Sequence, residues 1–127
     1  MGKQRILVID DDETVTMLLQ AILEHAGYEV CVAGNGLEGN RYLWGDLKPD
    51  LIILDVMMPF LSGDSVAEIF KGNESTSSIP ILYASGKPER ELQALVAETG
   101  TDGYLTKPFG PAKVLQAVRA VLGQQAG

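Results

Sequence analysis

The chain has 127 residues, of which 46% are hydrophobic and 21% charged, and its formal net charge is −7. This length and apolar content suit one folded domain over residues 1–127, ordered from about residue 4 to about residue 123, and exclude a disordered segment. The acidic balance and the lack of a basic stripe argue against direct nucleic-acid binding. No apolar stretch reaches the ~20 residues of a membrane span, so we expect a cytoplasmic domain without membrane contact.

The first predicted strand is Arg5–Ile9, an apolar run that stops at residues 10–12, all of them aspartates. Apolar residues then recur at three- and four-residue steps, which predicts an amphipathic helix. Asp12 suits the N-cap of this helix and Gly27 the position just after its end. His25 falls in the last turn, and we interpret it as a helix-end residue rather than a ligand.

Residues 28–33 form the second predicted strand. The only cysteine, Cys31, lies in this apolar run and is interpreted as a small core residue rather than a nucleophile. A helix is predicted over residues 37–44. It should be short and irregular, because Gly39 and Asn40 are poor helix formers.

The third predicted strand is an unbroken apolar run, residues 51–54, that leads directly into Asp55. Such a run, bounded here by Pro49 and Pro59, is typical of a strand buried on both faces in a parallel sheet. Asp55 would then lie at the carboxyl end of a core strand, where open α/β sheets bind ligands. Taken alone, the aspartate could equally cap the turn that precedes the next predicted helix, residues 64–71.

The last two predicted strands are residues 79–84 and 103–105. A helix that opens at Pro88 and stops at Gly100 separates them, and a final helix covers residues 110–122. Strands and helices thus alternate along the whole chain with short connections. This pattern predicts an α/β fold in which a five-stranded parallel sheet carries helices on both faces.

Polar side chains stand at the carboxyl ends of the predicted strands. They are Asp10, Asp11, Asp55, Ser85 and Lys107. Because these ends meet at one edge of a parallel sheet, the carboxylates should cluster, and a cluster of repelling acids is tolerable with a bound cation. Oxygen ligands of this kind suit Mg²⁺. The chemistry that needs such a set is phosphoryl transfer to an aspartate, with a metal and a lysine offsetting the phosphoryl charge.

Five segments together resemble the response-regulator receiver domain of bacterial two-component signalling. They are ILVIDDD at residues 6–12, DLIILDVMMP at 50–59, SG at 62–63, SG at 85–86 and GYLTKPF at 103–109. The match covers nearly the whole chain. It implies a flavodoxin-like (βα)5 fold with strand order 2-1-3-4-5.

The resemblance also implies a role for each residue of the cluster. Asp55 would accept a phosphoryl group from a phosphohistidine of a sensor histidine kinase or of a histidine phosphotransfer protein. Mg²⁺ would bind to Asp11, to Asp55 and to the backbone carbonyl of Met57, with Asp10 acting through water. Lys107 would bind the phosphoryl group. Apart from this self-catalysed transfer and a slow loss of phosphate, no enzyme activity is implied.

The output also follows from the resemblance. Ser85 would be the switch hydroxyl, and Tyr104 would change rotamer on activation. The surface that changes would comprise the fourth helix, the fifth strand and the fifth helix, read by an effector domain or by a second copy of the chain. The peptide bond between Lys107 and Pro108 would be cis.

Two other functions fit parts of the sequence. Residues 10–14 match the DxDxT pattern of haloacid-dehalogenase-type phosphatases, with Asp10 as nucleophile and Asp12 as general acid. Those enzymes need further acids after the lysine, and no Asp or Glu follows Lys107. A degenerate receiver that only binds partners is disfavoured because every residue needed for phosphorylation is present. Whether the domain stands alone, opens a longer regulator or belongs to a hybrid kinase stays open.

Overall fold

The apolar runs of the sequence become the strands of one parallel sheet. A computed structural model describes residues 2–43, 48–58 and 61–123. The strands are β1 (Arg5–Ile9), β2 (Glu29–Ala33), β3 (Leu51–Asp55), β4 (Ile81–Ser85) and β5 (Gly103–Thr106). They pair in the order β2-β1-β3-β4-β5, all parallel, so the predicted fold class and strand order are confirmed.

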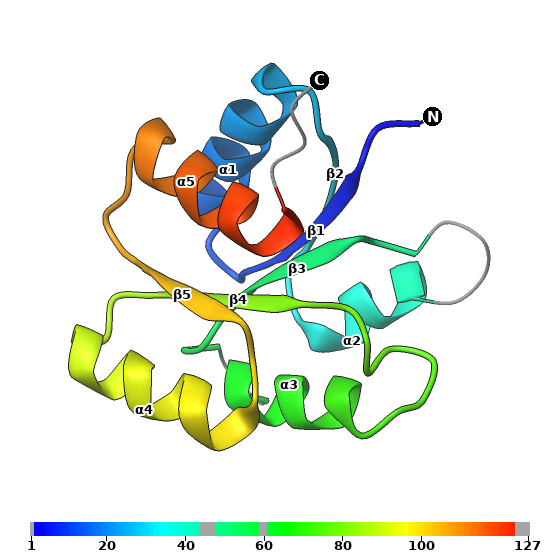
Figure 1. Ribbon diagram of the computed structural model, residues 1–127, viewed down its shortest axis with the longest axis vertical. Coiled ribbons are helices and arrows are strands. Elements are labelled where there is room, and N and C mark those ends of the chain that lie inside the picture. The colour runs from blue at the N-terminus through cyan, green and yellow to red at the C-terminus, as the bar shows by residue number, and fades with distance from the viewer. Residues whose placement is uncertain (1, 44–47, 59–60, 124–127) are drawn as a thin grey trace.

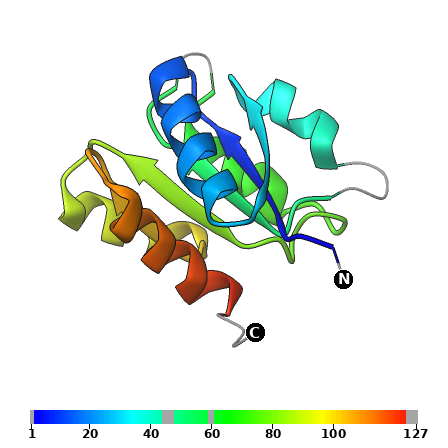
Figure 2. The same cartoon turned by 90° about the horizontal axis from the view of Figure 1, so that it is seen from above.

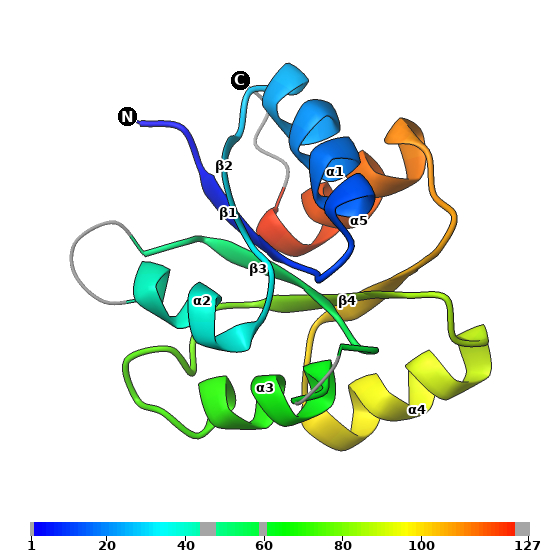
Figure 3. The ribbon, with the colours of Figure 1, turned by 180° about the vertical axis from the view of Figure 1, so that it is seen from behind.

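Helices cover both faces of the sheet. They are α1 (Glu13–His25), α2 (Gly36–Asn40), α3 (Gly63–Lys71), α4 (Glu89–Thr99) and α5 (Pro111–Leu122), and a 3-10 turn, η1 (Arg41–Leu43), follows α2. Figure 1 shows α1 and α5 on one face and α2, α3 and α4 on the other. Figure 2 shows α1 and α5 next to each other from above, and Figure 3 shows the opposite face. No helix in the described part of the chain is long and apolar enough to cross a membrane.

Each inner strand contributes to two apolar layers because successive side chains point to opposite faces of a sheet. In β3, Ile52 and Leu54 pack into the layer under α2, α3 and α4, whereas Leu51 and Ile53 pack into the layer under α1 and α5. All residues of β3 and β4 are buried. The unbroken apolar run before Asp55 therefore has the two-sided burial that the sequence predicted.

The helix ends follow the predicted signals. Asp12 caps α1, its carboxylate accepting the N–H of Thr14 at 2.9 Å. Gly27, just past the end of α1, has a φ of 100°, a left-handed conformation that glycine adopts without strain. The Lys107–Pro108 peptide bond is cis, as predicted.

The helix α2 is short, as predicted, and its end at residue 44 lies outside the described residues. The sequence analysis treated Gly39 only as a weakness of this helix, and the structure gives it a purpose. A Cβ atom at Gly39 would lie 2.6 Å from Cδ1 of Ile9, so the glycine lets α2 approach β1 closely.

The observed strands differ from the predicted ones at their ends. β4 begins at Ile81 rather than residue 79, because the N–H of Ile79 donates to Thr76 in the preceding turn and Pro80 has no N–H to give. β5 continues to Thr106, which pairs with Ser85. Neither difference moves a candidate site residue away from the carboxyl edge of the sheet.

Candidate functional site

The site forms where β1, β3 and the segment after β5 end at the same edge of the sheet. Asp10 follows β1, Asp55 ends β3 and Lys107 follows β5. The chain is fixed on both sides of this edge, since the N–H of Asp10 donates to Ala33 at 3.1 Å and the N–H of Lys107 to Ser85 at 2.8 Å. Residues far apart in sequence thus meet because parallel strands share an edge.

Asp10 is a buried carboxylate with both oxygens engaged. One oxygen, Oδ1, accepts the backbone N–H of Asp12 at 2.9 Å. The other, Oδ2, accepts the Nζ of Lys107, also at 2.9 Å. Asp10 therefore holds the lysine in place and is poorly prepared to attack a substrate.

Asp55 lies beside this pair and is also buried, with 4% of its surface exposed. Its Oδ1 accepts the N–H of Met57 at 3.2 Å and lies 3.5 Å from the Nζ of Lys107. Both of these contacts fall on the same carboxylate oxygen. The carboxylate is thus held at the sheet edge by the start of the loop that follows it.

Asp11 completes a cluster of acids with Asp10 and Asp55. One ligand oxygen from each of the three carboxylates lies within 4.8 Å of the other two. Asp11 is exposed, whereas its two partners are buried. One lysine against three carboxylates leaves a local charge of about −2, which a divalent cation would balance.

Burial and charge shift the pKa values of the two central groups. Burial, and then the nearby charge of Asp10, raise the pKa of Asp55 from its usual 3.8 to about 6, against the opposing effect of Lys107. Burial alone would lower the pKa of Lys107. The hydrogen bond to Asp10 and the charges of Asp10 and Asp55 outweigh it and raise that pKa. At neutral pH the lysine is charged and Asp55 is largely an available nucleophile.

The raised pKa of Asp55 predicts a pH-dependent stability of the metal-free protein. The unfolded carboxyl loses its proton near pH 4 and the folded one near pH 6, so stability falls as the pH rises through this window, by about 3 kcal/mol. Asp55→Asn removes the ionisation. Urea unfolding in chelator should find this variant about 2–3 kcal/mol more stable than wild type at pH 8 and equal to it near pH 4. A difference independent of pH would contradict the assignment.

The two residues predicted to act as a switch lie on adjacent strands. Ser85 is fully buried, and its Oγ accepts the N–H of Lys87 at 3.1 Å. Tyr104 is partly exposed, and its hydroxyl donates to Glu89 at 2.6 Å and accepts from Gln93 at 3.1 Å. The structure places Ser85 at the site edge and ties Tyr104 to α4.

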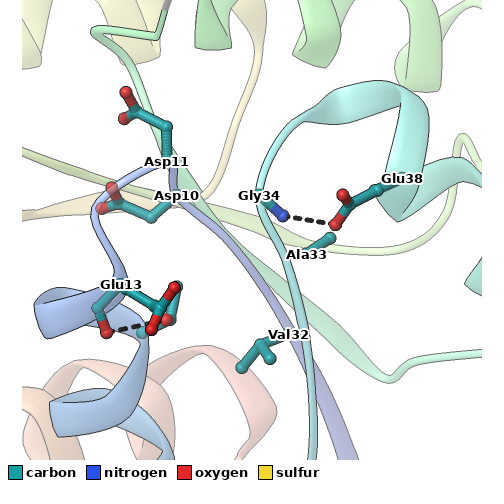
Figure 4. Close-up of a pocket in the computed structure, with 8 residues that line it drawn as sticks. Asp10, Asp11, Glu13, Val32, Ala33, Gly34 and Glu38 are labelled. Atoms are coloured by element: carbon teal, nitrogen blue, oxygen red, sulfur yellow. Dashed lines mark hydrogen bonds between the residues drawn. The ribbon is translucent and has the colours of Figure 1, made fainter.

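A hollow of about 250 Å³ opens beside Asp10 and Asp11, between α1, the end of β2 and α2. Figure 4 shows Glu13 from α1 and Glu38 from α2 on its two sides, with the Glu38 carboxylate accepting the N–H of Gly34 at 2.8 Å. The sequence analysis gave neither glutamate a role. Both lie in the first turn of a helix that follows a strand, and this placement was the signal available in the sequence.

Comparison with known proteins agrees with this geometry. The family model described as the response regulator receiver domain matches residues 6–119. The chain belongs to this family. It is 41% identical over 119 residues to the alkaline phosphatase synthesis transcriptional regulatory protein PhoP of Bacillus subtilis, a match that covers 94% of the chain and 48% of PhoP. It is 38% identical over 122 residues to the phosphate regulon transcriptional regulatory protein PhoB of Pseudomonas aeruginosa, covering 96% of the chain and 53% of PhoB.

Solved receiver structures share the fold. The chemotaxis response regulator CheY4 of Vibrio cholerae superposes with a TM-score of 0.87 at 28% identity, covering 95% of this chain and all of CheY4. The receiver domain thus spans about half the length of the curated relatives it matches and nearly the whole of a matching receiver structure. Receiver domains of response regulators are signalling modules of two-component systems, so the prediction of the family and its class of function is confirmed.

Proposed function

We propose that this receiver accepts a phosphoryl group on Asp55 from a phosphohistidine of a sensor histidine kinase or of a histidine phosphotransfer protein. The observation that carries the proposal is the pairing of a buried carboxylate with a lysine 3.5 Å away, next to two further acids. Such an arrangement fits transfer of a charged group to an aspartate, because the positive charge is already in place where phosphoryl oxygens would gather.

In the proposed step, a carboxylate oxygen of Asp55 forms a bond to phosphorus while the bond between phosphorus and the imidazole nitrogen of the donor breaks. The bonding electron pair stays on that nitrogen, which regains the lone pair of a neutral imidazole. Lys107, oriented by Asp10 at 2.9 Å, turns its ammonium group to the phosphoryl oxygens. Asp55 becomes an acyl phosphate, which water can later hydrolyse.

The acid cluster fits Mg²⁺ by its all-oxygen donor set and its uncompensated negative charge. We assign Asp11 and Asp55 as direct ligands together with the backbone carbonyl of Met57, with Asp10 acting through water. Bound there, Mg²⁺ would supply positive charge to the phosphoryl oxygens. The residues themselves bind the ion, hold the carboxylate and orient the lysine.

Asp11→Ala should weaken Mg²⁺ binding by on the order of tenfold or more, because it removes one of three clustered carboxylates. Asp11 is exposed, so the fold should be unaffected. A titration with Mg²⁺ alone, followed by amide chemical shifts, measures the affinity. Asp12→Asn is the matched control, since it removes a neighbouring charge and keeps a side chain that caps α1. Equal affinities for wild type and Asp11→Ala would refute the ligand assignment.

We further propose that phosphorylation changes the surface made by α4, β5 and α5. A phosphoryl group adds charge and strong acceptors beside Ser85, whose hydroxyl could turn towards it. The movement would vacate space next to β4 for the ring of Tyr104. This is a population shift between two packings, and an effector domain or a second copy of the chain would read it.

Ser85→Ala should leave Asp55 able to accept phosphate and uncouple Tyr104 from it. The comparison uses amide chemical shifts with and without beryllofluoride, a phosphoryl mimic. In wild type the mimic should shift the resonances of α4 and Tyr104, and in the variant it should shift mainly those around Asp55. Equal shifts of α4 and Tyr104 in both proteins would show that Ser85 does not carry the signal.

The experiment for the proposed function itself is incubation with acetyl phosphate and Mg²⁺, followed by intact-mass analysis. The mass should rise by a single phosphoryl group, and chelator should prevent the increase. An unchanged mass, with a fold intact by circular dichroism, would favour a receiver that only binds partners. The phosphatase alternative is disfavoured because both oxygens of Asp10, its nucleophile, are engaged by Asp12 and Lys107.

A further inference from the structure

Helix α4 is only weakly held by the apolar core. Leu92 is the one residue of this helix that is buried, and side chains of Leu95 and Val96 add partly buried contacts. A helix with so little buried surface opens at low free-energy cost. Its position must therefore depend strongly on other contacts.

Two tyrosines supply such contacts. Tyr83 of β4 and Tyr104 of β5 are register partners in neighbouring strands, so both side chains leave the sheet on the same face. Both pack in the apolar layer under α2, α3 and α4. Each tyrosine hydroxyl then reaches a different end of α4.

Tyr83 reaches the C-terminal end of the helix from inside the core. Its ring is fully buried, and its hydroxyl donates to Oγ1 of Thr99 at 2.9 Å. Thr99 in turn donates to the carbonyl of Leu95 at 2.8 Å and lies 3.2 Å from Oγ1 of Thr101. Because a buried hydroxyl loses much when its partner leaves, this network fixes the C-terminal turn of α4 to β4.

Tyr104 reaches the N-terminal half of the helix at the surface. Its hydroxyl donates to Oε2 of Glu89 at 2.6 Å and accepts from Nε2 of Gln93 at 3.1 Å. Both bonds are exposed to solvent. Water replaces such bonds readily, so this contact holds Tyr104 in its present position but releases it at small cost.

We propose that α4 is hinged at its C-terminal end by Tyr83, and that Glu89 and Gln93 form a latch that holds Tyr104 in the unphosphorylated arrangement. The proposal rests on the switching of Tyr104 in the proposed function and adds the residues that set its threshold. Glu89 and Gln93 act here as positioning residues, since neither belongs to the acid cluster or contacts Lys107 in the described structure.

The latch has a definite sign. It stabilises the arrangement in which Tyr104 is bonded to α4, so every phosphoryl mimic that favours the other arrangement must first break it. Removing the latch raises the population of the binding-competent state and tightens the mimic. Loss of an exposed hydrogen bond to a carboxylate corresponds to roughly a two- to fivefold change.

The test measures beryllofluoride affinity in the presence of Mg²⁺. Glu89→Ala and Tyr104→Phe should each bind the mimic roughly two- to fivefold more tightly than wild type. Before any mimic is added, the ring carbon resonances of Tyr104 in Glu89→Ala should already lie part-way towards their bound positions. Glu91→Ala is the matched control, because it removes the other acid of the first turn, ion-paired to Lys87, and should leave the affinity unchanged.

The hinge has its own variant. Tyr83→Phe keeps the buried ring and should speed amide exchange at the C-terminal turn of α4 without tightening beryllofluoride. If Glu89→Ala binds the mimic as wild type does, the latch is overturned while the proposed function stands. If Glu91→Ala tightens it equally, helix-end charge rather than the latch is responsible. If wild type does not bind the mimic at all, the proposed function fails, and the latch with it.

Discussion

Asp55→Asn is expected to abolish phosphorylation by acetyl phosphate, lowering the rate by at least about a thousandfold, because an amide oxygen is a far weaker nucleophile than a carboxylate. The substitution keeps the size and shape of the side chain. It also removes a buried charge, so the variant should be at least as stable as wild type at neutral pH. Loss of phosphorylation would therefore reflect the missing nucleophile rather than an unfolded protein.

The measurement compares phosphorylation rates in wild type, Asp55→Asn and the control Asp12→Asn under the same donor and Mg²⁺ concentrations. Asp12 is exposed and caps α1, and its asparagine variant should react like wild type. Residual phosphorylation of Asp55→Asn near the wild-type rate would mean that another carboxylate is the acceptor.

Gly63→Ala is expected to lower the free energy of unfolding by about 3 kcal/mol and the thermal midpoint by roughly 10 °C. Gly63 opens α3 against the end of β3, and its N–H donates to the carbonyl of Val56 at 2.8 Å. An added Cβ would lie 2.1 Å from the backbone oxygen of Asp55 and 2.7 Å from Cα of Val56. Backbone atoms cannot rotate away, so α3 or the end of β3 must move.

Either movement displaces Asp55, so the variant should also be phosphorylated more slowly. Gly110→Ala is the control, because a Cβ there meets nothing within 4 Å, and it should cost less than about 1 kcal/mol. Thermal unfolding followed by circular dichroism measures both. Equal midpoints for the two variants would contradict the close packing of α3 on β3.

The sequence was sufficient for the strands and for the edge of the sheet at which they end. The run before Asp55 is buried on both faces, as its unbroken apolar character predicted. The same argument gathered Asp10, Asp55 and Lys107, and the structure brings them within 3.5 Å of one another through the lysine. Strand-end position in a parallel sheet is a long-range constraint that can be read from local patterns.

Side-chain partners could not be predicted in this way. The sequence analysis assigned Lys107 to the phosphoryl group, whereas the lysine lies closer to Asp10 than to Asp55. Which carboxylate it meets depends on small differences in strand length and loop path. The contacts of Tyr104 with Glu89 and Gln93 depend likewise on how α4 lies over β5.

Close backbone approaches were also missed. Gly39 and Gly63 were interpreted as poor helix positions or turn residues, because propensity is a local property. Their contacts are with Ile9 and with the backbone at Asp55 and Val56, on strands distant in sequence. A missing side chain leaves no periodic signal, so only the packed structure shows what it makes room for.

The central claim is that Asp55 is the phosphoacceptor, and mapping the modified residue tests it most directly. The protein is phosphorylated with acetyl phosphate and Mg²⁺, the acyl phosphate is reduced with borohydride to leave a stable homoserine, and the digest is sequenced by mass spectrometry. The account predicts homoserine at position 55 alone. Homoserine at position 10, 11 or 12 with Asp55 unmodified would contradict it.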